Sequence, residues 1–211
     1  MTDDDNQDEV IEEIKAILIG NCGVGKTNII LRYLKNEFNQ NSLTTNGANY
    51  GMKKVTIDEI QYQINIWDTA GQEKYRSVTK MFIQDTNIIV FVYSIDDKSS
   101  FEDLNYWFNL TKEITGDEQV VFGVAGNKCD LFEREAVKEE DGKKFAEEHN
   151  AFFQLTSAKE GKESIDEFFE LLLREYIKIL NKKKIEHKNS IKIDRKEKKK
   201  EKCCGGKKKK K

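Results

Sequence analysis

The chain has 211 residues, a length that fits one α/β domain with tails. Its net charge of −2 hides a strong asymmetry: residues 181–211 carry 16 Lys and Arg against 4 Asp and Glu, a net charge of +12, and residues 1–180 have a net charge of −14. No run approaches the roughly 18 apolar residues of a membrane span, the first nine residues are too acidic for a secretory signal, and the four cysteines lack zinc or disulfide spacing. We therefore expect a reduced, cytoplasmic protein whose basic end meets a membrane surface or a nucleic acid.

Short apolar runs alternate along the chain with segments of helical periodicity. Asp58-Glu59 predicts a hairpin turn between the second and third apolar runs. The predicted strands are residues 14–19, 55–57, 62–67, 88–93, 120–125 and 152–155. The predicted helices are residues 28–34, 101–114, 133–149 and 164–180.

This alternation predicts a doubly wound α/β fold, with a six-stranded, mostly parallel sheet flanked by about five helices. A ligand is expected at the C-terminal ends of the strands. We expect an acidic N-terminal extension at 1–11 and the folded domain at 12–180. Residues 181–211 lack a sustained apolar face, which predicts a disordered basic tail.

The run from Gly20 to Thr27 fits the pattern G-x-x-x-x-G-K-[ST] and lies between a predicted strand and a predicted helix. Its glycines let backbone N–H groups wrap a β-phosphate at the positive end of the helix. Lys26 would bridge β- and γ-phosphates, and the Thr27 hydroxyl would bind Mg²⁺. The motif alone leaves GTPases, ATPases and small-molecule kinases open. The expected cradle residues are Cys22, Gly23, Val24, Gly25, Lys26, Thr27 and Asn28.

Asp68 directly follows the apolar segment 62–67 and belongs to the run W-D-T-A-G-Q-E at 67–73. An aspartate in this place beside a phosphate loop can hold Mg²⁺ through water. The Gly71 N–H can reach the γ-phosphate, and Gln72 can orient the attacking water as the catalytic residue. In isolation Asp68 could be a turn residue and Gln72 a solvated loop residue, but the phosphate loop upstream favours the metal and water roles.

The run W-D-T-A-G-Q-E resembles the motif that the Rab branch of the Ras-superfamily small GTPases carries. The resemblance covers about residues 12–180, with five motifs in order at compatible spacings. Thr45 lies 18 residues after Thr27, where this family places its switch I threonine. The resemblance implies that the Thr45 hydroxyl completes the Mg²⁺ shell when GTP is bound.

Asn127, Lys128 and Asp130 follow the predicted strand 120–125 and resemble the N-K-x-D motif of the family. Asp130 can accept hydrogen bonds from guanine N1–H and the exocyclic amine, a donor pair that adenine lacks. A wrong base would leave a buried carboxylate unpaired, so this residue favours guanine. Asn127 can donate to the opposite edge of the base, and the Lys128 stem can lie over the ring.

Residues 156–159 read T-S-A-K and resemble a second base-binding motif of the family. The resemblance places Ser157, Ala158 and Lys159 at the nucleotide, with the Ala158 N–H on guanine O6. Phe38 matches the aromatic position that packs against the base from switch I, although an aromatic side chain there could also be part of the core.

The Rab branch fits better than the other branches. The 30 residues from Asn127 to Ser157 leave no room for the inserted helix of Rho, Thr2 excludes the myristoylated N-terminus of Arf, and the basic end differs from the acidic end of Ran. The segments 46–50 (N-G-A-N-Y) and 82–86 (F-I-Q-D-T) depart from the usual Rab sequences, which indicates ordinary nucleotide chemistry with unusual partners. The residues that match the Rab aromatic triad are Tyr50, Trp67 and Phe82.

Cys203-Cys204 resembles the paired prenylation signal of Rabs, although Gly205-Gly206 and five lysines follow it. We expect geranylgeranylation at one or both cysteines, with an unmodified basic tail as the alternative. Lipid and clustered lysines would hold the protein peripherally on the cytosolic face of intracellular membranes. The tail has no interleaved aromatics, so a nucleic-acid partner is not expected.

These features predict a slow GTPase switch in vesicle trafficking that binds guanine nucleotide with Mg²⁺ and meets exchange factors, effectors and an activating protein through its switch regions. No arginine finger is evident within the chain, so an activating protein is expected to accelerate hydrolysis by about 10³–10⁵. The alternatives are a nucleotide-locked binding scaffold that does not hydrolyse GTP and a Ras-branch signalling GTPase. A small-molecule kinase would need an acceptor site and a lid that the sequence does not suggest.

Overall fold

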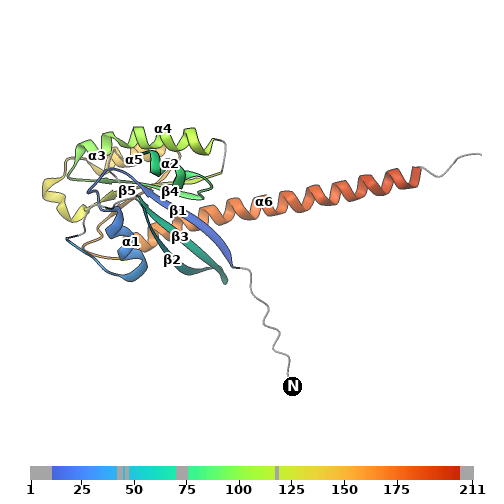
Figure 1. The fold of residues 1–211 in the computed structure, drawn as a ribbon, viewed down its shortest axis with the longest axis horizontal. Helices are drawn as coiled ribbons and strands as arrows, with labels where there is room; N and C mark the ends of the chain where they lie inside the picture. The colour runs from blue at the N-terminus through green and yellow to red at the C-terminus, as the bar shows by residue number, and fades with distance from the viewer. Residues whose placement is uncertain (1–10, 42–44, 46–47, 70–75, 117–118, 205–211) are drawn as a thin grey trace, which may run out of the picture.

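The computed structural model describes residues 11–41, 45, 48–69, 76–116 and 119–204, with the backbone alone at 48, 76–79 and 186–204. Within these residues, six strands form one sheet in the order β2-β3-β1-β4-β5-β6 (Figure 1). The β2–β3 pair is antiparallel and the other four pairs are parallel. The strands are β1 Glu12–Ile19, β2 Ala48–Ile57, β3 Ile60–Thr69, β4 Ile88–Ser94, β5 Val121–Asn127 and β6 Phe152–Thr156.

Helices cover both faces of this sheet (Figure 1). Alternate side chains of β1 point to opposite faces, so Ile14 and Leu18 pack in one core with α1 and α6, while Ile17 and Ile19 pack in a second core with α4 and α5. The predicted α/β architecture is therefore confirmed. The helices in the described residues are α1 Lys26–Lys35, α2 Arg76–Ile83, α3 Lys98–Glu102, α4 Leu104–Thr115, α5 Glu139–Glu148 and α6 Glu163–Cys204, with a 3₁₀ helix, η2, at Cys129–Arg134.

The turn predicted at Asp58-Glu59 joins β2 and β3 as expected. Both residues have positive φ, 50° for Asp58 and 67° for Glu59, the left-handed conformation that suits a two-residue hairpin. The turn also touches a distant helix, because Arg174 of α6 donates to an Asp58 carboxylate oxygen at 2.9 Å.

Three points of the helix prediction need correction. The helix expected at 133–149 begins only at Glu139, because the N–H groups of Ala136 and Val137 donate to the Ile95 carbonyl and the Val137 side chain is buried. The helix α2 was not anticipated. The helix expected at 101–114 is resolved as α3 and α4, which meet at Asp103.

The C-terminal segment also differs from expectation. Disorder was predicted from residue 181, but α6 continues to Cys204. Its sequence from Glu163 to Cys204 contains neither Gly nor Pro and is rich in Lys and Glu, which favour helix even without an apolar face. Residues 205–211 and the acidic segment 1–10 lie outside the described part of the chain. No helix in the described ranges is both long and apolar enough to cross a membrane.

Candidate functional site

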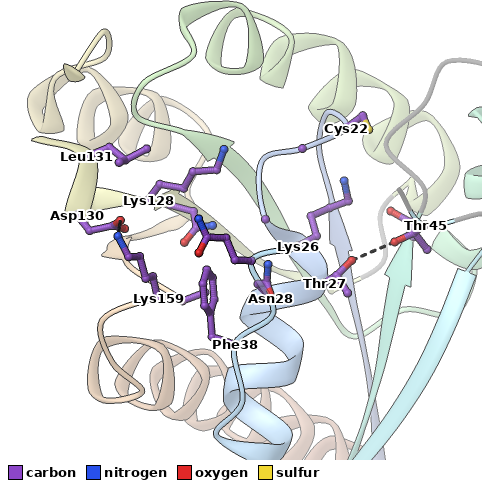
Figure 2. Close-up of a pocket in the computed structure, with 16 residues that line it drawn as sticks. Cys22, Lys26, Thr27, Asn28, Phe38, Thr45, Lys128, Asp130, Leu131 and Lys159 are labelled. Carbon is purple, nitrogen blue, oxygen red and sulfur yellow. Dashed lines mark hydrogen bonds and ion pairs between the residues drawn. The ribbon is translucent and has the colours of Figure 1, made fainter. Parts of the chain in front are cut away.

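A cavity of about 380 Å³ opens where β1, β5 and β6 end (Figure 2). Four loops form it: the β1–α1 loop, the loop after α1, the loop after β5 and the loop after β6. Its volume lies within the range of small-molecule sites. Figure 2 shows Asp130 and Lys159 at one end, Lys26, Thr27 and Thr45 at the other, and Phe38 between them. The predicted site residues that line it are Cys22, Gly23, Gly25, Lys26, Thr27, Asn28, Phe38, Thr45, Asn127, Lys128, Asp130, Ala158 and Lys159.

The β1–α1 loop needs glycine for steric reasons. Gly25 has φ of 99°, and a Cβ atom there would clash with the Asn127 side-chain amide. A Cβ atom at Gly20 would clash with the Val92 carbonyl. With these positions free of side chains, α1 begins directly at Lys26 and presents its positive N-terminal end to the cavity, where an anion would bind.

Lys26 is held at the base of this loop and is only 5% exposed. Its Nζ donates to the carbonyl oxygens of Gly20 and Asn21, both at 2.8 Å. Burial lowers the pKa of Lys26 to about 8, and the attraction of Asp68 opposes that shift. A partly desolvated ammonium beside a helix N-terminus is a strong site for an anion such as a phosphate.

Three oxygen-bearing side chains converge beside Lys26. The Thr27 hydroxyl donates to Asp68 Oδ2 at 2.7 Å, the Thr45 hydroxyl donates to the same atom at 3.2 Å, and the two hydroxyls lie 3.0 Å apart. Asp68 is 2% exposed, and its Oδ1 has no hydrogen-bond partner in the described part of the chain. Burial raises the pKa of Asp68, although the Thr27 hydroxyl and the Lys26 charge oppose the shift.

This donor set fits Mg²⁺, which prefers hard oxygen ligands and is usually held by one or two carboxylates together with phosphate oxygens and water. An unpartnered, buried carboxylate oxygen is costly without a cation or donor, and Asp68 Oδ1 is such an atom. Thr27, Thr45 and Asp68 are the residues that would hold the ion.

The opposite end of the cavity is built around two polar side chains. The Ser157 hydroxyl donates to Asp130 Oδ1 at 2.7 Å and accepts the Glu160 N–H at 3.1 Å, which fixes the direction of the carboxylate. The Asp130 side chain is 7% exposed, and Lys159 forms an ion pair with its Oδ2 at 3.7 Å. A fixed carboxylate of this kind selects a ligand that offers paired N–H donors.

Asn127 lines the cavity and also holds neighbouring segments together through its side-chain amide. It is fully buried, its amide donates to the Val24 carbonyl at 2.8 Å, and its Oδ1 accepts the Thr156 hydroxyl at 3.2 Å. The amide therefore ties the ends of β5 and β6 to the phosphate loop. Its neighbour Lys128 has φ of 63° and lies 4.0 Å from an Asp96 carboxylate oxygen.

Three described site residues are close to the cavity without lining it: Val24 is buried in the core, Ser157 acts through Asp130, and Asp68 lies behind the Thr27 and Thr45 hydroxyls that it accepts. Gly71 and the catalytic candidate Gln72 lie outside the described residues, so their roles stay predictions. The predicted triad packs as one group, with ring centroids 5.1 Å apart for Tyr50 and Trp67 and 5.0 Å apart for Trp67 and Phe82.

Sequence reasoning missed three lining residues: Gln40, Thr69 and Leu131. Thr69 and Leu131 directly follow motif residues and could have been included, whereas nothing in the sequence distinguishes Gln40. It also missed Arg32, whose guanidinium donates to the carbonyl oxygens of Ala158 and Lys159 at 2.8 and 3.2 Å and so supports the loop after β6 from α1.

Comparison with known proteins gives consistent matches. A family model described as Ras family matches residues 15–178. The GTP-binding protein ypt3 of Schizosaccharomyces pombe is 35% identical over 180 residues, 85% of this chain and 83% of that protein. Ras-related protein RABA1b of Arabidopsis thaliana is 38% identical over 172 residues, 82% and 79% of the two chains, and Ras-related protein Rab11B of Nicotiana tabacum is 37% identical over 172 residues, 82% and 78%. The segment that the family model matches contains every residue lining the cavity.

Proposed function

This chain belongs to the Ras family and is a Rab-like GTPase, and on that premise we propose that it cycles between GTP-bound and GDP-bound forms as a molecular switch in vesicle trafficking. One observation carries the proposal. A single cavity has a cationic, hydroxyl-rich end at Lys26, Thr27 and Thr45 and, at the other end, the Asp130 carboxylate held by Ser157. A nucleoside triphosphate with a guanine base matches both ends.

The triphosphate would lie over the β1–α1 loop. Lys26 would exchange its two carbonyl contacts for β- and γ-phosphate oxygens, and the N-terminus of α1 would stabilise the same charge. Mg²⁺, when bound, would neutralise charge on the β- and γ-phosphates. Thr27 and Thr45 offer their hydroxyls to that ion and Asp68 its carboxylate, through water.

The base would lie between Phe38 and Lys128, with its edge on Asp130. Ser157 holds the carboxylate in position, so that the two guanine N–H groups meet two fixed acceptor oxygens. The Ala158 N–H would meet guanine O6, and Arg32 supports that residue by binding its carbonyl. Adenine would leave the buried Asp130 carboxylate without its donors, which disfavours ATP.

For hydrolysis, Gln72 would orient the attacking water and the Gly71 N–H would contact the γ-phosphate. Thr45 already lies beside Thr27 and Asp68, and a bound γ-phosphate would strengthen its hold there. Hydrolysis would weaken that hold and change the surface that effectors read. Transition-state charge would be stabilised by Lys26 and the loop N–H groups. Turnover would be slow until an activating protein assists.

Single-turnover GTP hydrolysis tests the chemistry, with Gln72→Leu as the control. We expect slow but measurable turnover in the wild type and none in the variant. If neither the wild type nor the variant hydrolysed GTP, the switch proposal would be wrong and a nucleotide-locked scaffold would be favoured. Competition of ATP and GTP for the same site tests the base selectivity, and ATP binding as tight as GTP would contradict the role of Asp130.

The trafficking role rests on the likeness to Rab and Ypt proteins, which favours the Rab branch over Ras-type signalling. We expect exchange factors, effectors and an activating protein to bind the switch regions, and lipid on Cys203 or Cys204 to hold the protein on the cytosolic face of intracellular membranes. Intact-mass analysis of the cell-derived membrane fraction tests the lipid. A mass that shows no prenyl group would exclude that anchor. A pull-down that compares GTP-loaded with GDP-loaded protein would identify the effectors.

A further inference from the structure

A side chain in the first turn of α1 holds the loop that follows this helix. Asn28 is 8% exposed, and its amide forms a reciprocal pair with the backbone of Asn39. The Asn28 Nδ2 donates to the Asn39 carbonyl at 3.1 Å, and the Asn39 N–H donates to Asn28 Oδ1 at 3.0 Å. One side chain thereby satisfies both backbone groups of a residue eleven positions away.

The residues on either side of Asn39 are Phe38 and Gln40, and both line the nucleotide cavity. Phe38 is still 36% exposed, so packing alone holds its ring weakly. The Asn39 side chain takes no part in the pair with Asn28. Its Oδ1 accepts the Asn41 N–H at 3.0 Å and so shapes the next turn. Asn28 therefore anchors the backbone of the residue that lies between Phe38 and Gln40.

We propose that Asn28 is a latch that keeps the 38–40 loop closed over the bound guanine nucleotide and thereby sets the rate at which the nucleotide leaves. Asn28 is a positioning residue in this role, because it acts through Phe38 rather than on the reacting atoms. The inference rests on the proposed function, since it assumes that a guanine nucleotide occupies the cavity. It adds a kinetic consequence: exchange requires this pair to open.

The first test measures dissociation of fluorescently labelled GDP into excess unlabelled GDP. Asn28→Ala removes both hydrogen bonds and should accelerate dissociation about tenfold, the effect expected from two ordinary hydrogen bonds. Asn39→Ala is the matched control, because it keeps the backbone groups that Asn28 binds; its dissociation rate should stay within about twofold of the wild type. Equal acceleration by both variants would overturn the latch.

A double-mutant cycle separates the latch from a direct contact between Asn28 and the nucleotide. If Asn28 acts through Phe38, then Asn28→Ala should add little once Phe38→Ala has removed the ring. Fully multiplicative acceleration in the double variant would show that Asn28 acts independently of Phe38 and would overturn the proposal. If Asn28→Ala does not fold, Asn28→Ser carries the same cycle, since serine is too short to make the paired contact.

Removal of Mg²⁺ with EDTA tests whether Asn28→Ala accelerates nucleotide dissociation through the metal site. The latch acts through Phe38 and not through the metal-binding residues, so the acceleration ratio of Asn28→Ala should be the same with Mg²⁺ and with EDTA. A ratio that falls to one in EDTA would place the effect at Thr45 and the metal instead. Failure of the proposed function looks different, because wild-type protein would then bind no labelled GDP under either condition.

Discussion

At the scale of single residues, the environment of the Asp68 carboxylate is costly without a ligand. It is almost fully buried, shares its Oδ2 with two hydroxyls, and has no partner for Oδ1 in the described part of the chain. We predict that Asp68→Asn lowers Mg²⁺ affinity by roughly 10- to 100-fold, the loss typical of groups that act on a metal through water. The measurement is nucleotide dissociation as a function of Mg²⁺ concentration.

The same substitution should not unfold the protein, because an amide is cheaper to bury than a charged carboxylate. The melting temperature of Asp68→Asn in EDTA should therefore equal or exceed that of the wild type. A large loss of thermal stability in EDTA would mean that Asp68 is held for structural reasons, and the metal interpretation would then lose its main support.

Ser157 gives a second prediction for a single side chain. Its hydroxyl donates to the buried Asp130 carboxylate at 2.7 Å, and hydrogen bonds to charged groups contribute about 1.5–3 kcal/mol. Ser157→Ala should therefore weaken GDP binding by roughly 10- to 100-fold. Lys159→Met removes an ion pair whose lysine side chain is 59% exposed, so its effect should stay below about fivefold. Equilibrium titration of both variants with labelled GDP compares them, and a larger loss for Lys159→Met would reverse this assignment.

What could be predicted for individual residues depends on how local the signal is. Lys26, Thr27 and Asp130 lie in short motifs whose chemistry is legible from spacing, and the structure brings all three to one cavity. Arg32 and Asn28 work through backbone atoms far along the chain, so their partners have no signature in the sequence. The phosphate-loop motif placed Asn28 in the cradle but did not indicate that its amide holds residue 39.

Among the helices, α5 depends on a glycine for its fit against the sheet. A Cβ atom at Gly142 would clash with the Phe153 ring and lie 2.5 Å from Tyr93 Oη. Alanine in a helix normally stabilises by about 1 kcal/mol relative to glycine, but overpacking a core costs about 1–3 kcal/mol. We predict that Gly142→Ala lowers the free energy of unfolding by up to about 2 kcal/mol, measured by chemical denaturation.

Tyr93 supplies the control for that prediction. It is fully buried, burial raises its pKa, and its hydroxyl has no hydrogen-bond partner in the described residues. Tyr93→Phe should therefore be neutral or stabilising, and it should reduce the cost of Gly142→Ala by removing one of the two clashes. Strict additivity of the two substitutions would show that the hydroxyl does not limit the packing of α5.

The elements themselves were predictable where one local pattern decides them and less so where distant contacts do. The β2–β3 hairpin follows from two apolar runs around Asp58-Glu59, and both turn residues have positive φ, which suits a two-residue hairpin. The start of α5 is displaced to Glu139 because Val137 is drawn into the core and bonded to Ile95, a contact that periodicity does not reveal. The length of α6 was underestimated because an apolar face was required of it, whereas helix-favouring residues without a breaker were sufficient.

At the scale of the whole molecule, the acidic part of the sequence contains the folded body, and the basic part begins within the helix that projects from it. The acidic body carries the nucleotide site, and α6 projects beyond the sheet toward the basic end of the chain (Figure 1). Near the body, Lys184 of α6 donates to a Glu12 carboxylate oxygen of β1 at 2.6 Å, so the helix is tied to the sheet before it extends outward. Its 42 residues correspond to about 60 Å of helix, which separates the two ends.

We predict that this basic end binds anionic membranes without lipid attached. Replacing Lys207 to Lys211 by glutamine in the full chain removes five charges, each contributing up to about 1 kcal/mol near an anionic surface. Binding of unmodified recombinant protein to vesicles containing phosphatidylserine, measured by co-sedimentation at 0.1 M salt, should fall at least tenfold in this variant. GTP hydrolysis should not change, because the nucleotide-binding motifs lie far from these lysines in the sequence, between residues 20 and 159.

Varying the salt concentration and the lipid composition tests whether charge causes the vesicle binding. Attraction between exposed charges is screened within about 3 Å at 1 M salt, so wild-type binding should disappear there and on vesicles of phosphatidylcholine alone. Binding that persists on neutral vesicles or at high salt would mean that apolar contact holds the protein instead. In that case the five lysines would not cause the binding, and neither would lipid, because Cys203 and Cys204 are unmodified in this experiment.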